Sequence, residues 1–193
     1  MTQENEAGKQ AVSGITIFGE ETNAAFTSDV DRMSGQRTVQ CYQCGECTAG
    51  CPAAFAMDIS PNRVMRMVQL GCEKPVLQSS TIWLCAGCET CATRCPKGLS
   101  VSKVMDACRQ MAVEKKSKTR EKDVLTFHKQ FLAEVKRHGR IHEMGMLARY
   151  KVLSGQLFND MPLGMKMFMK GKLAIAPTKI KGVDEIKKIF RKM

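Results

Sequence analysis

Ten cysteines dominate the chemistry available to this chain of 193 residues, and all ten lie between Cys41 and Cys108. Eight of them form two runs with the same spacing, Cys-x2-Cys-x2-Cys-x3-Cys-Pro, which begin 44 residues apart. The first run holds Cys41, Cys44, Cys47 and Cys51, and the second holds Cys85, Cys88, Cys91 and Cys95. Thiolates grouped in this way are ligands for soft metal centres. The repeat therefore predicts two metal centres.

The spacing is typical of the run by which bacterial ferredoxins hold [4Fe–4S] clusters. Three thiolates spaced by two residues can wrap one face of the cube, and the small residues between them let backbone amides approach its sulfurs. In two-cluster ferredoxins the fourth cysteine of each run ligates the other cluster. The resemblance thus implies two [4Fe–4S] clusters, held by these two ligand sets: Cys41, Cys44, Cys47 and Cys95 for the first, and Cys85, Cys88, Cys91 and Cys51 for the second.

Structural zinc is the alternative cofactor, because Cys-x2-Cys pairs also bind zinc. In that case the chain would be a zinc-dependent scaffold protein. Zinc takes four ligands in two pairs. Each run here instead offers three cysteines at strict two-residue spacing, then a fourth cysteine and a proline. The spacing favours iron.

Helical patterns follow both runs. Ser60 and Pro61 have the types preferred at the N-cap and first position of a helix, which predicts a helix near 61–70. Ser100 begins the same pattern after the second run, with Val104, Met105, Cys108 and Met111 on one face. The duplication therefore covers each ligand run and the helix after it.

Two ferredoxin runs separated by helices resemble the α-helical ferredoxin family, and within it the C subunit of heterodisulfide reductase. The resemblance covers about 37–115 and rests on the residues around both runs, including Tyr42 and Trp83. It implies an all-α fold and an electron-transfer subunit that relays electrons through two [4Fe–4S] clusters. The implied partners are a flavin-containing A subunit and a B subunit with Cys-Cys-Gly motifs that acts on a disulfide or thiol. An iron–sulfur subunit feeding a membrane quinone oxidoreductase is the alternative within the redox class.

Several motifs of redox and nucleotide chemistry are missing from the sequence. It contains no Cys-Cys-Gly, no Cys-x4-Cys-x2-Cys run and no Gly-x-Gly-x-x-Gly after an apolar strand. We therefore identify no catalytic residue, and expect a chain that conducts electrons while its partners make and break bonds.

Positive charge is concentrated after the cysteines. Residues 1–110 contain 10 Lys and Arg against 11 Asp and Glu, whereas residues 111–193 contain 20 against 8. Apolar spacing predicts amphipathic helices over 122–139, 141–153, 162–169 and 183–192. With little core of their own, these helices predict a docking region for acidic partner proteins, and a solvated basic face without a partner is the alternative. No aromatic stacking platform or DNA-binding motif favours nucleic acid.

We expect three parts: a flexible N-terminal arm (1–36), the dicluster ferredoxin domain that the resemblance implies (37–115) and a helical basic extension (116–193). Within the arm, residues 15–18 could add a short strand, and Asn23 should cap a helix that ends at Gly35. Without a run of about 18 apolar residues or a signal sequence, we expect no membrane insertion and a cytoplasmic location.

Five further residues could be mistaken for ligands. Cys72 and Cys108 remain after eight ligands are assigned, and we expect both to be buried, inert thiols. His128, His138 and His142 lack ligand spacing, and we expect them at the surface or at an interface.

Overall fold

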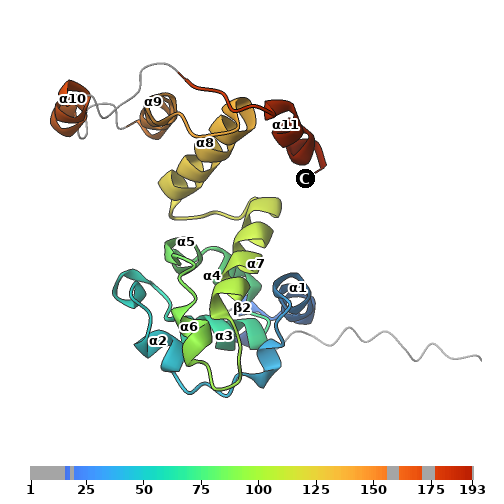
Figure 1. The fold of residues 1–193 in the computed structure, drawn as a ribbon. Helices are drawn as coiled ribbons and strands as arrows, with labels where there is room; N and C mark the ends of the chain where they lie inside the picture. The colour runs from blue at the N-terminus through green and yellow to red at the C-terminus, as the bar shows by residue number, and fades with distance from the viewer. Residues whose placement is uncertain (1–15, 18–19, 156–160, 171–176, 193) are drawn as a thin grey trace, which may run out of the picture. The chain divides into compact units, whose positions relative to one another are not determined.

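The computed structural model describes residues 16–17, 20–155, 161–170 and 177–192. Residues 1–15 of the expected flexible arm lie outside the described residues. Contacts divide the chain into two compact units, Met1–Arg120 and Glu121–Met193, which are described separately. The described residues are helical apart from a two-residue antiparallel ladder, β1 (Thr16–Ile17) with β2 (Glu20–Glu21) (Figure 1). The all-α prediction is confirmed.

The first helix, α1 (Ala24–Ser34), begins and ends where its capping residues predict. The side chain of Asn23 accepts a hydrogen bond from the Ala25 amide at 3.0 Å, and Gly35 ends the helix with a φ of 65°. Phe26 and Val30 are fully buried, and α1 contacts the helices after both ligand runs. A segment assigned to the N-terminal arm thus contributes to the core of the first unit.

Each ligand run leads into a core helix, as predicted. The first run is preceded by η1 (Thr38–Gln40), contains α2 (Glu46–Ala49), and is followed by η2 (Ala54–Ala56) and α3 (Pro61–Gln69). The second follows α4 (Glu73–Leu77) and α5 (Thr81–Leu84), contains α6 (Thr90–Arg94) and leads into α7 (Val101–Glu114). In Figure 1, α7 passes α1, while α2 and α6 lie side by side; both pairs are in contact. The core consists of the fully buried side chains on these helices: Val64, Met65, Val68, Val76, Ile82, Val104 and Cys108.

The two core helices are capped differently. Ser100 accepts a hydrogen bond from the Lys103 amide at 3.3 Å, as expected of an N-cap serine. Ser60 occupies the N-cap position of α3, but its side chain makes no capping bond and donates to Asn62 instead. The Thr48 hydroxyl accepts from the Asn62 amide at 3.0 Å in its place. Ser60 is thus the N-cap residue, as predicted, but a threonine of the ligand run supplies the side-chain acceptor for the first turn.

The second unit is built on α8 (Lys122–His138), which contacts both α9 (Glu143–Ser154) and α11 (Val183–Lys192). Phe127 of α8 packs edge-on against Tyr150 of α9, with ring centroids 5.8 Å apart. Further along the chain lies α10 (Met161–Met169). Each helix predicted for this region is present.

Among the described residues of this second unit, Glu134 is the most buried charged one, with 1% of its surface exposed. Its carboxylate accepts hydrogen bonds from Arg149 at 2.5 Å and from the His138 ring at 2.9 Å. His138 is itself buried and not at the surface, because the buried carboxylate one turn earlier gives its ring a polar partner in the interior. The other expectation for His138, a place at an interface, stays a prediction. His128 is exposed, and His142 caps α9 through Nδ1.

Replacing Gly71 by alanine should destabilise the first unit more than the same change at Gly35. Both glycines have positive φ, so each alanine pays about 1–2 kcal/mol for the left-handed conformation. A Cβ at Gly71 would also lie 2.6 Å from the Asn23 carbonyl oxygen, whereas at Gly35 it meets nothing within 4 Å. Urea unfolding of the full chain under anaerobic conditions measures the difference. Equal losses would contradict the close approach of Gly71 to Asn23.

The Glu134→Gln variant should loosen the contact between α8 and α9, because two arginines and His138 lose a buried carboxylate. We expect a loss of about 1–3 kcal/mol, since the arginines are partly exposed to solvent. Hydrogen exchange of the α8 and α9 amides measures this loss. Glu143→Gln removes the same charge from an exposed position and is the control. Similar exchange rates in the two variants would show that Glu134 does not hold the helices together.

Candidate iron–sulfur site

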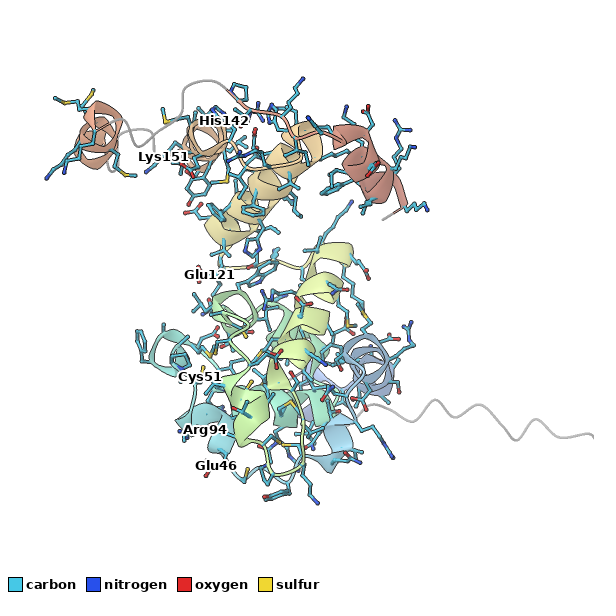
Figure 2. All side chains as sticks on the ribbon, in the orientation of Figure 1. Glu46, Cys51, Arg94, Glu121, His142 and Lys151 are labelled. Atoms are coloured by element: carbon cyan, nitrogen blue, oxygen red, sulfur yellow. The ribbon has the colours of Figure 1, made fainter. Side chains whose placement is uncertain are left out.

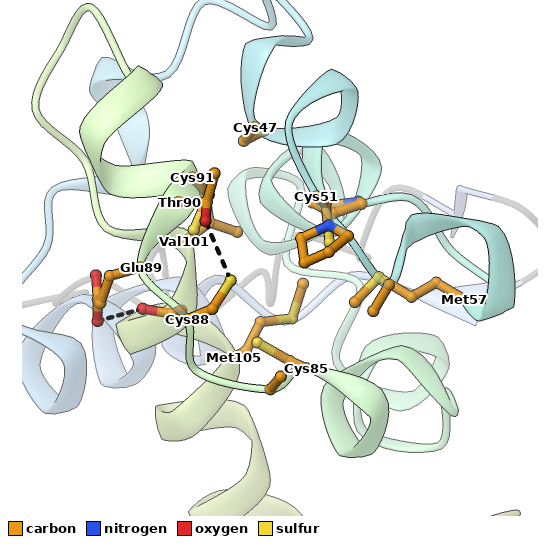
Figure 3. Close-up of a pocket in the computed structure, with 15 residues that line it drawn as sticks. Cys47, Cys51, Met57, Cys85, Cys88, Glu89, Thr90, Cys91, Val101 and Met105 are labelled. Atoms are coloured by element: carbon orange, nitrogen blue, oxygen red, sulfur yellow. Dashed lines mark hydrogen bonds between the residues drawn. The ribbon is translucent and has the colours of Figure 1, made fainter.

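Cysteines from both runs surround one hollow in the first unit. Cys85, Cys88 and Cys91 line it together with Cys51 and Cys47 of the first run (Figure 3). Apolar side chains complete the wall, among them Met57, Val101 and Met105. Thiols that are 34 or more residues apart along the chain thus face a common space.

The thiols of the first run form a second group beside this hollow. The pKa of the Cys47 thiol is raised to about 11, chiefly by burial; a hydrogen bond with Thr48 lowers it, and the neighbouring Cys41, Cys91 and Cys44 add to the rise. Tyr42 lies beside Cys44 and Cys95, both of which raise the pKa of its hydroxyl after the larger effect of burial. Cys95 of the second run is therefore close to the first run. Cys47 lies at the border of the two groups, because it is near Cys41 and also lines the hollow.

Short helices of the two runs bring the groups together. Helix α2 contacts α6, and Glu46 at the start of α2 lies 4.0 Å from Arg94 at the end of α6 (Figure 2). The approach is close: a Cβ on Gly50 would lie 2.3 Å from the Arg94 side chain. A larger residue at this position would therefore require the half-exposed Arg94 side chain to move aside.

Asp58 connects the loop after Cys51 to the helix before Cys85. Its carboxylate accepts hydrogen bonds from the backbone amides of Ser80 and Thr81 at 2.9 and 3.0 Å, and from the Thr81 hydroxyl at 2.7 Å. Burial opposes ionisation of Asp58, but these bonds outweigh it and lower the pKa of the carboxyl group. Asp58 thereby fixes the path of the chain between the two runs, a role that local sequence patterns did not reveal.

Left-handed backbone positions recur in both runs. The third residues, Gln43 and Gly87, have φ of 65° and 63°, and the fifth residues, Gly45 and Glu89, have φ of 85° and 59°. Glu89 is held there by Ser100 and Ser102, whose hydroxyls donate to its carboxylate at 2.8 and 2.5 Å. The repeat seen in the sequence is thus a repeat of backbone conformation as well.

Hydrogen-bond donors are directed at the cysteine sulfurs. Backbone amides of Val101 and Ser102, at the N-terminus of α7, bond to Cys91 and lower its pKa, although burial has the larger, opposite effect. The hydroxyl of Thr90 lies 3.4 Å from Cys88 Sγ (Figure 3), and Gln43 Nε2 donates to Cys41 Sγ at 3.4 Å. Donors and a helix N-terminus aimed at sulfur suit a negatively charged group. The residues therefore fit an iron–sulfur cluster held by thiolates.

No group of three or more His, Cys, Asp or Glu side chains in the described part of the chain has the arrangement that holds a single metal ion. All ten cysteines are free thiols. Cys72 and Cys108 are buried, with 1% and 0% of their surface exposed, as predicted for thiols that pack in the core.

Comparisons with known proteins agree with this geometry. Residues 38–99 match the 4Fe–4S dicluster domain family. Over 75 residues the chain is 39% identical to the iron–sulfur C subunit of the CoB–CoM heterodisulfide reductase of Methanopyrus kandleri, a match that covers 39% of each chain. A second relative, the C2 subunit of a heterodisulfide and ferredoxin reductase of Methanococcus maripaludis, is 34% identical over 104 residues, or 50% of this chain and 56% of its own length. The matches thus span about half or less of these relatives.

The predicted resemblance to the C subunit of heterodisulfide reductase is confirmed by these relatives.

Among the described residues, none of the helices has the length and apolar character that spanning a membrane requires.

Cys108 should resist alkylation in the folded protein. Complete burial raises the pKa of its thiol to about 12, so at pH 8 only about one molecule in 10,000 carries the reactive thiolate. Unfolding returns the pKa to its ordinary value near 8.5 and restores reactivity. Mass spectrometry after timed iodoacetamide treatment, with and without denaturant, measures the labelling of Cys108. Equally fast labelling in both conditions would rule out the buried position.

The cysteine runs, their helical setting and the match over residues 38–99 agree: this part of the chain is similar to 4Fe–4S dicluster domains, including those of heterodisulfide reductase C subunits.

Proposed function

We propose that the chain is an electron-transfer subunit with two [4Fe–4S] clusters, working in a complex of the heterodisulfide reductase type. The observation that carries this proposal is the hollow in which Cys51 of the first run faces Cys85, Cys88 and Cys91 of the second. When bound, such clusters accept and release single electrons.

The proposed ligand sets are Cys41, Cys44, Cys47 and Cys95 for one cluster, and Cys51, Cys85, Cys88 and Cys91 for the other. Two observations support the crossing of the fourth ligands: Cys51 lines the hollow of the second run, and Tyr42 of the first run is close to Cys95. Cys47 borders both groups, so the two clusters would be neighbours. Adjacent clusters permit an electron to pass between them within this one chain.

The proposed partners are a flavin-containing A subunit and a B subunit with Cys-Cys-Gly motifs that acts on a disulfide or thiol. The names of the relatives support this assignment, since they describe C subunits of reductases for the CoB–CoM heterodisulfide. The basic second unit is the proposed docking region. Its α9 exposes Leu147, Val152 and Leu153 beside basic side chains, a combination that suits an acidic surface with apolar positions.

Anaerobic purification of the full chain with its associated proteins tests the proposed function. We expect about eight iron and eight acid-labile sulfide per chain. We also expect a co-purified protein with Cys-Cys-Gly motifs, held by contacts that weaken as salt rises. A colourless chain with zinc and no acid-labile sulfide would exclude the redox role. Co-purification of a membrane anchor would instead favour a quinone-linked complex.

Serine at position 95 should disturb the cluster of the first run. The hydroxyl is a poorer ligand for iron than a thiolate, so Cys95→Ser should change the EPR signal of the cluster bound by Cys41, Cys44 and Cys47. Cys51→Ser should change the other signal. Cys72→Ser alters a buried cysteine outside both runs and is the control. If Cys95→Ser and Cys51→Ser each affect the cluster of their own run, the crossed ligand sets are wrong.

A further inference from the structure

Gln43 has an unusual backbone conformation for its residue type. Its φ of 65° lies in the left-handed region, which strains every residue with a Cβ, and the equivalent position of the second run is Gly87. A side chain kept at a strained position beside a functional site calls for a compensating interaction.

The side chain of Gln43 supplies such an interaction. Its Nε2 donates a hydrogen bond to Cys41 Sγ at 3.4 Å, and Cys41 is the first thiol of its run. Glu89, the other strained residue of the two runs, is held by Ser100 and Ser102, so its conformation serves the packing of α6 on α7. Gln43 instead directs its donor at a ligand sulfur.

The second run obtains its side-chain donor from a different position. Gly87 has no side chain, and the Thr90 hydroxyl lies 3.4 Å from Cys88 Sγ. A sulfur bound to iron has no proton to give, so Thr90 is the donor in the loaded protein. Gln43 and Thr90 therefore direct side-chain donors at sulfurs of different runs, from different residue types at different positions. In the first run, the hydroxyls of Thr48 and Tyr42 also interact with Cys47 and Cys44.

We propose that Gln43 and Thr90 separately set the reduction potentials of the two clusters, a role that rests on the proposed function. One-electron reduction takes a [4Fe–4S] cluster with four thiolates from a net charge of −2 to −3, with no bond broken. The electron comes from a one-electron reductant, such as dithionite in the test below. A hydrogen bond to a ligand sulfur stabilises the more negative state, and so raises the potential. Gln43 acts on the cluster that Cys41 binds, and Thr90 on the cluster that Cys88 binds.

A purely structural role for Gln43 makes a different prediction for Gln43→Gly. Glycine relieves the left-handed strain, so the variant should be as stable as the wild type or more stable under either interpretation. A structural role leaves both potentials unchanged. A role in setting the potential lowers one of them, despite the unchanged or improved stability.

Potentiometry of the full chain, monitored by EPR under anaerobic conditions, distinguishes the two roles. Gln43→Gly and Gln43→Met both remove the N–H donor, and Met keeps the side-chain length and the strain. Both should lower the reduced-to-oxidised ratio of one cluster several-fold at its wild-type midpoint potential. Thr90→Val should do the same to the other cluster. Gln40→Met changes an exposed glutamine nearby and should shift neither.

Three results would overturn the proposal: unchanged potentials in the Gln43 variants, a shift in Gln43→Gly that Gln43→Met lacks, or equal shifts of both clusters in either variant. Iron and sulfide analysis of the wild type tests the proposed function separately. A wild-type chain without acid-labile sulfide refutes the clusters themselves, whereas a fully loaded chain with unchanged potentials refutes only the role of Gln43.

Discussion

The convergence of thiols from two distant runs on shared spaces is the constraint on which the rest of the first unit depends. Sulfur ligands that bind iron are negatively charged, and gathering four of them in an apolar hollow is unfavourable unless donors surround them. The amides at the start of α7, the Thr90 hydroxyl and the Gln43 amide are such donors. The unit is therefore organised around sulfur and its hydrogen bonds as much as around its apolar core.

The core helices serve this arrangement directly. Helix α7 presents Val101 and Met105 to the hollow, and one turn later Arg109 donates to the carbonyl of Cys85 at 3.3 Å. One helix thus closes the site, bonds to Cys91 and holds the backbone of Cys85. Asp58 complements it, because it ties the chain after Cys51 to the start of α5. Mispacking of α7 would consequently disturb the site as well as the core.

Local sequence patterns predicted the parts of this structure that depend on local physics. The helices follow from apolar spacing, and Asn23 and Gly35 mark the ends of α1 because capping is decided within a few residues. The cysteine spacing predicted the dicluster domain for the same reason, because each ligand run is a pattern within a few residues. The boundaries proposed at residues 36 and 115 remain predictions, although α1 packs into the core of the first unit.

The features that the sequence did not reveal all depend on contacts between distant segments. Thr48 replaces Ser60 as the acceptor at the start of α3, Asp58 reaches Thr81, and Arg149 of another helix joins Glu134 and His138. None of these pairs has a local signature, so only the fold showed that these side chains are partners.

In the second unit, a buried charge is again stabilised by hydrogen-bond donors, but it joins two helices. The Glu134 carboxylate pairs with Arg149, Arg137 and His138, so this one acidic side chain helps to join α8 to α9. Residues 121–193 contain 16 basic residues against 7 acidic ones, so more than half of the basic residues have no acidic counterpart in this unit's sequence. Exposed apolar side chains on α9 accompany this charge. A surface with both properties binds most strongly where a partner supplies acidic groups and apolar positions together, because charge directs the approach and apolar burial then slows dissociation.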